Sequence, residues 1–330
     1  MAIHIGRRKF TALLGGAAAA WPLVGRAQQP PMPVIGLLTS RAAGDSPQLL
    51  AALRQGLKDT DFVEGQNVTI EYRFAGNRND LLPTLAADLV HRQVNLILAT
   101  TTTAALAAKA ATTTIPIVFE MGSDPVRLGL VASLSRPGGN VTGITQLNIV
   151  VAPKRLELLH ELVPTATMVV LLIDPTDPVA EPIIRDLQTA ARTLGLQLHI
   201  LNASTEADFD PVFTKIVQLR AGGLVLGAGA FFTARAEQLA ALALRYAVPA
   251  VYEGRTFVMA GGLASYGSSL IDSYRLAGLY AGRVLKGEKP TDLPVQQSTK
   301  LEMFLNLKTT KSLCISVPLP LSGRADEVIE

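Results

Sequence analysis

Residues Leu96 to Ala110 read LILATTTTAALAAKA, and this stretch decides the fold class. The apolar run that opens it is typical of a buried strand, and the alanine-rich end is typical of a helix. Four threonines, Thr100 to Thr103, stand at the junction. A strand that leads directly into a helix is the unit from which α/β folds are built.

The same unit recurs on both sides of this stretch. In the first part of the chain, short apolar runs begin at residues 34, 68, 94 and 115 and alternate with amphipathic stretches. A second set begins at residues 168, 196, 222 and 248, with helices expected over 178–194, 208–220 and 232–246. A strand–helix–strand unit needs about 26 residues, which is the spacing here. Two such sets predict an α/β fold with two lobes rather than one long sheet.

Three irregular passages lie between or after these sets, at residues 136–145, 261–270 and 286–300, with a helix expected over 271–286. Three passages let the chain leave the first lobe, return and leave again, so we expect three hinge crossings. We assign residues 33–143 and 267–295 to lobe 1, and residues 146–263 and 300–330 to lobe 2.

The N-terminal segment has the parts of an export signal. A double arginine in GRRKFT precedes an apolar stretch from Ala12 to Val24, and small residues end it at Ala27. The apolar stretch is too short to span a bilayer. We expect a twin-arginine signal peptide over 1–27, cleaved near Ala27, and a periplasmic mature chain without membrane insertion; a Sec signal and a membrane anchor are the alternatives.

Charge and cysteine content limit the possible partners. Removing residues 1–27 takes 4 of the 30 basic residues and none of the 27 acidic ones, leaving 26 against 27. A chain with this balance has no electrostatic footprint for nucleic acid. Cys314 is alone, which excludes an intrachain disulfide and a lipid-attachment cysteine at the cleavage site. We expect a monomer.

Polar residues at the strand ends of lobe 1 are the first candidates for ligand binding. Ligands of open parallel sheets bind beyond the carboxyl ends of the strands. Thr100, Thr101 and Thr102 start a helix there, where free N–H groups favour an anion. Gly122, Ser123 and Asp124 follow the next strand. The threonines suit a carboxylate and Asp124 an ammonium; a simple N-cap and a simple turn remain the alternatives.

The other strand ends add further candidates. Ser40 ends the first strand of lobe 1, while Asp174 and the pair Tyr252–Glu253 end strands of lobe 2. A carboxylate in a cleft needs a cationic partner. Glu253 would therefore bind a ligand cation, or form an ion pair with Arg255 or Arg275.

The catalytic and cofactor motifs that we sought are missing. GLVLGAGAFF follows a strand but has Phe232 where the third glycine of a dinucleotide fingerprint belongs. The three histidines beyond the leader sit on separate elements, with no spacing that suggests a metal site. No nucleophile has a base nearby in the pattern. We expect no cofactor, no metal and no catalytic residue.

Several stretches resemble one family. They are VIGLLTS from Val34, GSDPV from Gly122, RPGGNVTG from Arg136, KRLELLHELVP from Lys154 and LPVQQSTKLEMFLNLKTTKSL from Leu293. The chain from about residue 33 onward is similar to the ABC transporter substrate-binding proteins that include tryptophan- and phenylalanine-binding lipoproteins. The resemblance implies a type I periplasmic binding protein, with two Rossmann-like lobes that close on the ligand and present it to a permease with its ATPase. It also adds Gln146 and Tyr266, near the crossings, as binding residues.

The combined expectation is an exported receptor of an ABC importer. It would bind a small carboxylate-bearing solute, such as an amino acid, by hinge closure, and would not be an enzyme. The alternative is an exported α/β enzyme acting on a small carboxylic acid, since folds do not fix function. A repressor of the same architecture would need a DNA-binding motif before residue 34, where the export signal stands instead.

Overall fold

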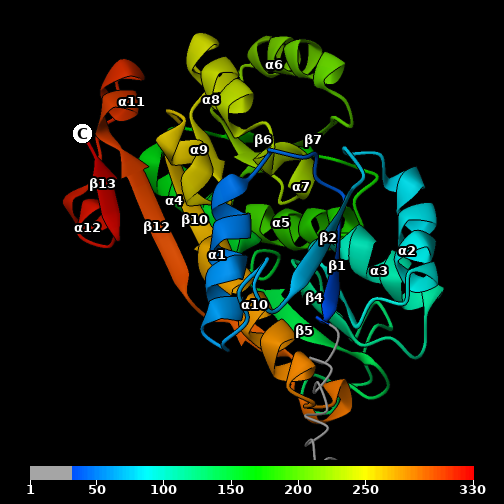
Figure 1. The fold of residues 1–330 in the computed structure, drawn as a ribbon. Coiled ribbons are helices and arrows are strands. Elements are labelled where there is room, and N and C mark those ends of the chain that lie inside the picture. The colour runs from blue at the N-terminus through cyan, green and yellow to red at the C-terminus, as the bar shows by residue number, and fades with distance from the viewer. Residues whose placement is uncertain (1–31) are drawn as a thin grey trace, which may run out of the picture. The chain divides into compact units, whose positions relative to one another are not determined.

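The structure, a computed structural model, describes residues 32–330 and contains the two expected α/β lobes (Figure 1). The expected signal peptide lies outside the described residues. The six-stranded sheet of lobe 1 has the order β11-β5-β4-β3-β1-β2, and all its pairs are parallel. Its strands are β1 (Val34–Thr39), β2 (Thr69–Phe74), β3 (Leu96–Ala99), β4 (Ile117–Met121), β5 (Val141–Gln146) and β11 (Gln296–Ser298).

The seven-stranded sheet of lobe 2 has the order β13-β12-β10-β9-β8-β6-β7, and only its β10–β12 pair is antiparallel. Its strands are β6 (Met168–Ile173), β7 (Gln197–Asn202), β8 (Gly223–Leu226), β9 (Ala250–Tyr252), β10 (Ala264–Ser268), β12 (Leu301–Asn306) and β13 (Glu327–Ile329). The predicted parallel core strands of both lobes are confirmed.

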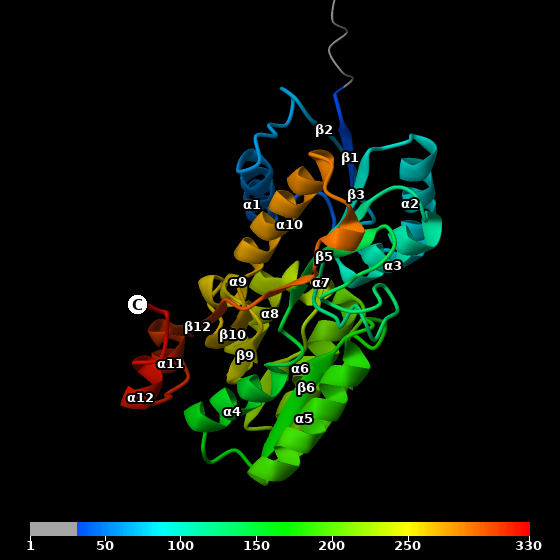
Figure 2. The same ribbon diagram turned by 90° about the horizontal axis from the view of Figure 1, so that it is seen from below.

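Helices cover both faces of the first sheet. One face carries α1 (Pro47–Lys58) and α10 (Leu270–Leu285), which lie side by side although far apart in sequence (Figures 1 and 2). The other face carries α2 (Leu82–His91) and α3 (Thr102–Ala111), preceded by the short η1 (Asn79–Leu81). Each helix buries its apolar stripe against strand residues that are fully buried, which is the main force that holds such layers together.

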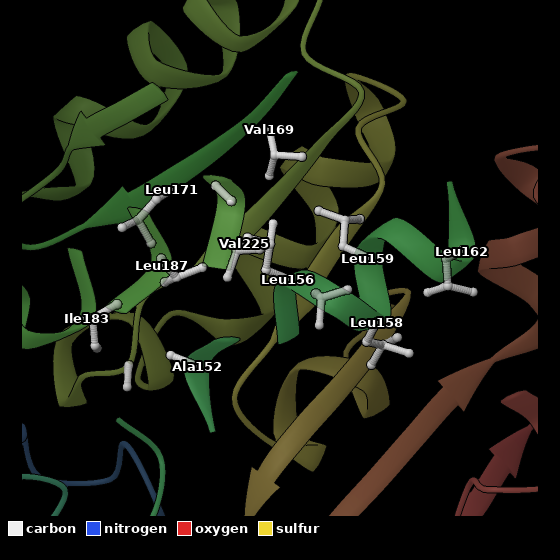
Figure 3. Packing of buried hydrophobic residues seen from close by; sticks show 14 of the residues in the cluster. Ala152, Leu156, Leu158, Leu159, Leu162, Val169, Leu171, Ile183, Leu187 and Val225 are labelled. Carbon is white, nitrogen blue, oxygen red and sulfur yellow. The ribbon is translucent and has the colours of Figure 1, made fainter. Parts of the chain in front are cut away.

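The second sheet is covered in the same way. Figure 3 shows α4 (Ala152–Leu162) and α5 (Ala180–Leu194) packing on β6 and β8 through leucine, isoleucine and valine side chains. The opposite face carries α6 (Phe209–Gln218) and α8 (Ala236–Arg245). The remaining elements are η2 (Glu206–Asp208), α7 (Ala230–Thr233), α9 (Arg255–Met259), η3 (Pro290–Asp292), α11 (Leu307–Ser312) and α12 (Leu319–Ser322).

The chain passes between the two sheets three times, as expected (Figure 2). It leaves the first sheet after β5, returns between β10 and α10, and leaves again between β11 and β12. The passages are shorter than the sequence suggested, because β5 and β10 each occupy about half of one expected passage, and η3 and β11 lie within the third. Their small and polar residues, such as QQS in β11 and ASYGS in β10, hid these strands from a search for apolar runs.

Candidate functional site

A cavity lies where the strand ends of the two lobes face each other. Most of its lining comes from residues that directly follow strands, as expected for ligand sites of parallel sheets. Lobe 1 and the first crossing contribute Ser40, Arg41, Asn77, Asn79, Thr100 to Thr103, Glu120, Met121, Gly122, Gln146 and Asn148, with Leu270 from the start of α10. Lobe 2 contributes Asp174, Thr176, Asp177, Val179, Ser204, Ala228 to Phe231, Thr233 and Glu253.

Eight of the twelve sequence-predicted residues line this cavity. They are Ser40, Thr100, Thr101, Thr102, Gly122, Gln146, Asp174 and Glu253. They come from the ends of β1, β3, β4, β5, β6 and β9, so both lobes contribute. The structure therefore brings together residues that are up to 213 positions apart in sequence, from Ser40 to Glu253.

The threonine run contains the helix cap that the sequence offered as one of two interpretations. Thr101 is the N-cap of α3, and its Oγ1 accepts the N–H of Ala104 at 3.3 Å. The same oxygen accepts the N–H of Ser40 at 3.4 Å, which ties the end of β1 to the helix. The Thr102 hydroxyl bonds that of Ser123 at 3.0 Å. The N–H groups at the start of α3 still lie at the cavity, where an anion is favoured.

Ser123 and Asp124 lie beside the cavity, in a neighbouring depression. Asp124 Oδ1 accepts the N–H groups of Val126 at 2.9 Å and Arg127 at 3.2 Å, so the carboxylate caps the turn that follows β4. This is the alternative that the sequence left open. The placement gives no support to Asp124 as the partner of a ligand ammonium.

The two tyrosines also lie away from the cavity lining. Tyr252 is 1% exposed and stacks on Phe257, with 4.7 Å between ring centroids, inside the core under α6 and α8. Tyr266 packs against the core on the other face of the sheet. Tyr252 is the last residue of β9 and turns into the core, while Glu253, the first residue beyond the strand, lines the cavity.

Sequence reasoning missed Arg41, the residue after Ser40. Its side chain lines the cavity and is only 8% exposed. Among residues 32–330, Nε and Nη1 of its guanidinium have no hydrogen-bond partner. Burial acts to lower its pKa, but Tyr274, Glu120 and Glu253 outweigh burial and raise it. Arg41 is thus a buried cation with unused donors, and its position two residues past the end of β1 was the available signal.

Glu120 was also missed, although a single acid inside the apolar strand IVFEM was a usable signal. It is 3% exposed and accepts a hydrogen bond from the Gln146 amide. Burial raises its pKa to about 7, opposed by the Gln146 bond and by Arg41 and reinforced by Glu253.

Lobe 2 holds further buried carboxylates. Burial raises the pKa of Glu253, against the opposing effect of Arg155 and of bonds from Thr233 Oγ1 at 2.7 Å and the Gly229 N–H at 3.3 Å. Both expected ion-pair partners of Glu253 are wrong, since Arg255 pairs with Glu327 and Arg275 with Asp59 and Asp272.

Asp177 and Asp174 stand at the end of β6. Burial raises the pKa of Asp177 to about 6, opposed by the Val179 N–H and reinforced by Asp174 and Glu253. Asp174 Oδ1 accepts the N–H and the hydroxyl of Thr176 at 2.9 and 2.8 Å. The cavity therefore holds several carboxylates and one arginine.

Within residues 32–330, no group of three or more His, Cys, Asp or Glu side chains is arranged to hold a metal ion. No helix in this part of the chain has the length and apolar character needed to cross a membrane.

Comparison with known proteins gives a consistent result. Residues 46–329 match the family model described as "ABC transporter substrate binding protein". A curated relative, the "Tyrosine-binding protein" of Clostridioides difficile (strain R20291), is 28% identical over 262 residues, which cover 78% of this chain and 74% of the relative.

Two solved structures share the fold. A conserved domain protein from Vibrio cholerae superimposes with a TM-score of 0.83 at 23% identity, over 90% of this chain and 99% of that one. A Streptococcus pneumoniae ABC domain in complex with L-Trp superimposes with a TM-score of 0.82 at 22% identity, with the same coverage.

Proposed function

Because this chain belongs to the family of ABC transporter substrate binding proteins, we propose that it is the exported receptor of an ABC importer and binds a small amino-acid-like solute. The observation that carries the solute class is Arg41, whose buried guanidinium has two nitrogens without a partner among residues 32–330 and lines the cavity together with buried carboxylates. The names of two relatives, which refer to tyrosine and L-Trp, agree with this class.

The carboxylate of the solute would bind at Arg41. A buried charge is costly unless it is paired and hydrogen-bonded, and the planar guanidinium matches the two oxygens of a carboxylate. The start of α3 lies on the same side of the cavity, and its free N–H groups and positive dipole end also favour an anion.

The ammonium of the solute would bind at the carboxylates. Glu120 of lobe 1 and Glu253 and Asp177 of lobe 2 all line the cavity and are all buried enough for their pKa to be raised. An ammonium between them would stabilise their ionised forms. We therefore reassign the ammonium site from Asp124 to this carboxylate group.

Binding would close the two lobes on the solute. Arg41 and Glu120 lie on lobe 1, while Asp177 and Glu253 lie on lobe 2, so one ligand can contact both sets only when the lobes are together. A ligand shifts an equilibrium by its differential affinity for the two states. In this proposal the residue ranges 33–143 with 267–295 and 146–263 with 300–330 move as the lobes, except that β5 and β11 move with the first sheet and β10 with the second. No bond of the solute is made or broken.

Delivery to a permease with its ATPase, and export to the periplasm by the twin-arginine signal over residues 1–27, complete the proposal. Its first test is a thermal-shift screen of amino acids and aromatic acids on the protein lacking residues 1–27, followed by calorimetry. We expect L-tyrosine or L-tryptophan to bind better than tyramine, which lacks the carboxylate, and better than 3-(4-hydroxyphenyl)propionate, which lacks the ammonium. Equal binding of all four, or turnover of any of them, would contradict it.

A further inference from the structure

The floor of the cavity continues into a polar network at the hinge. Gln146 ends β5, and its amide donates to Glu120 of lobe 1 and accepts from Asn148 Nδ2 at 2.8 Å. The same Nδ2 lies 3.3 Å from Oε2 of Glu253, to which it donates. Two side-chain amides on the first crossing thus connect a carboxylate of one lobe with a carboxylate of the other.

Asn148 also joins the first crossing to the second. Its Oδ1 accepts the N–H of Ser268 at 2.8 Å, and the N–H of Leu147 donates to the Ser268 hydroxyl at 3.0 Å. These bonds fix the amide orientation, because a flipped Asn148 would set its NH₂ against the Ser268 N–H and its oxygen against a carboxylate. Asn148 is 1% exposed, so each of these groups depends on its protein partner.

Arg155, on α4, forms hydrogen bonds to the same two crossings. Its Nη2 donates to the carbonyl of Asn148 at 2.9 Å and its Nη1 to the carbonyl of Tyr266 at 3.2 Å. The side chain is fully buried, and its Nε has no partner in the part of the chain that the structure describes. Burial lowers the pKa of Arg155 to about 10, and the charge of Glu253 opposes that shift.

The backbone of β10 packs closely against Glu253 and Asn148 at Gly267. A Cβ on Gly267 would stand 2.0 Å from the carbonyl oxygen of Glu253 and 2.6 Å from Asn148 Oδ1. β10 can pass here only without a side chain. The cavity carboxylate, the Asn148 amide and the two crossings therefore form one contiguous unit.

We propose that Arg155 is a positioning residue that, through the backbone of Asn148 and Tyr266, couples occupation of the cavity to the geometry of the hinge. It touches no ligand, since it does not line the cavity. A cation bound at Glu253 would compete with Asn148 Nδ2 for Glu253 Oε2, and Arg155 holds the backbone carbonyl of that same asparagine. This inference rests on the proposed function for its ligand. The bonds from Arg155 to the carbonyls of Asn148 and Tyr266, which we call the bracket, rest on the structure alone.

Two variants of Arg155 separate the effect of its planar guanidinium from the effect of its positive charge. Arg155→Lys keeps a cation but replaces the planar fork with a compact ammonium, and Arg155→Met removes both. Ile183→Val, a change in the same lobe core at a fully buried position, is the matched stability control. Each is compared with the parent for melting temperature, dissociation rate and affinity, with L-tyrosine and L-tryptophan as probes.

We expect both Arg155 variants to weaken the probe that binds by about tenfold, mainly through faster dissociation, as coupling between linked sites usually amounts to 5- to 150-fold. The control should lose melting temperature but not affinity. An Arg155→Lys variant with the affinity of the parent and a lowered melting temperature would overturn the inference, leaving Arg155 a purely structural residue.

A second readout needs no ligand. Hydrogen exchange at the amides of Leu147 and Ser268 should be faster in both Arg155 variants than in Ile183→Val, because the bracket holds these groups. Unchanged exchange at both amides would refute the bracket. If no probe binds the parent, the proposed function fails while the exchange result still decides whether the bracket exists.

Discussion

Replacing Arg41 with methionine is the sharpest perturbation of the site. Methionine keeps an unbranched chain of similar reach and removes the charge and every donor. In the ligand-free protein, two guanidinium nitrogens have no partner among the described residues, so their loss breaks no bond that they make. The ligand-free variant should still be less stable than the parent, because Tyr274, Glu120 and Glu253 lose a nearby cation and the pKa values of the two carboxyls should rise further.

The effect on binding should be much larger. A hydrogen bond to a charged group contributes about 1.5–3 kcal/mol, and removing one partner of a buried charge pair costs about 2–5 kcal/mol. We take about 3 kcal/mol, which weakens the affinity for an amino acid roughly 150-fold. The decarboxylated amine of the same solute never paired with Arg41, so its weaker affinity should stay the same or improve.

Calorimetric titration of parent and variant with an amino acid and its amine measures both effects at once. Arg92→Met is the control, because Arg92 is half exposed on the outer end of α2 and pairs with Asp88. If Arg41→Met binds the amino acid as tightly as the parent, or still prefers it to the amine by the same factor, the carboxylate does not bind at Arg41.

Three further changes test other parts of the account. Burial raises the pKa of Glu120 to about 7 from an ordinary 4.5, so the native protein holds a proton that the unfolded chain releases at lower pH. The free energy of unfolding, measured with denaturant, should therefore fall by about 1–3 kcal/mol between about pH 5 and 8, and Glu120→Gln should flatten that fall; a parent profile without it would disprove the shift. Thr101→Ala should cost about 1 kcal/mol of stability, and Thr101→Ser should restore it, because the hydroxyl caps α3. Equal stability of all three proteins would rule out the cap. Gly267→Ala should lower stability by about 3 kcal/mol, since its Cβ would overlap the Glu253 carbonyl oxygen, and a normal melting temperature would show that β10 can move away.

The fold was predictable because its core strands are continuous apolar runs. LILA in β3 and VIGLLT in β1 are almost wholly buried, and buried parallel strands show this pattern most clearly. Thr101 was predicted as an N-cap because a hydroxyl side chain between a strand and a helix commonly caps that helix. Strands at the crossings escaped because their burial depends on partners distant in sequence rather than on local apolar character.

The site was predictable only in part. Thr100, Thr101 and Glu253 were predicted because ligands of parallel sheets bind beyond the carboxyl ends of the strands. A position at the end of a strand does not, however, determine which way a side chain points. Tyr252 faces the core because it is still within β9, whereas Glu253 lies one residue beyond the strand and lines the cavity. Asn148 was invisible in sequence, since its role depends on Ser268 and Glu253, more than 100 residues away.

Small-angle X-ray scattering of the protein lacking residues 1–27, with and without the solute found in the screen, tests the central claim most directly. If two lobes close on a solute held by its charged ends, the radius of gyration should fall on addition of the amino acid, and Arg41→Met should need a far higher concentration for the same fall. Superimposable curves at a saturating concentration of bound solute would contradict the account.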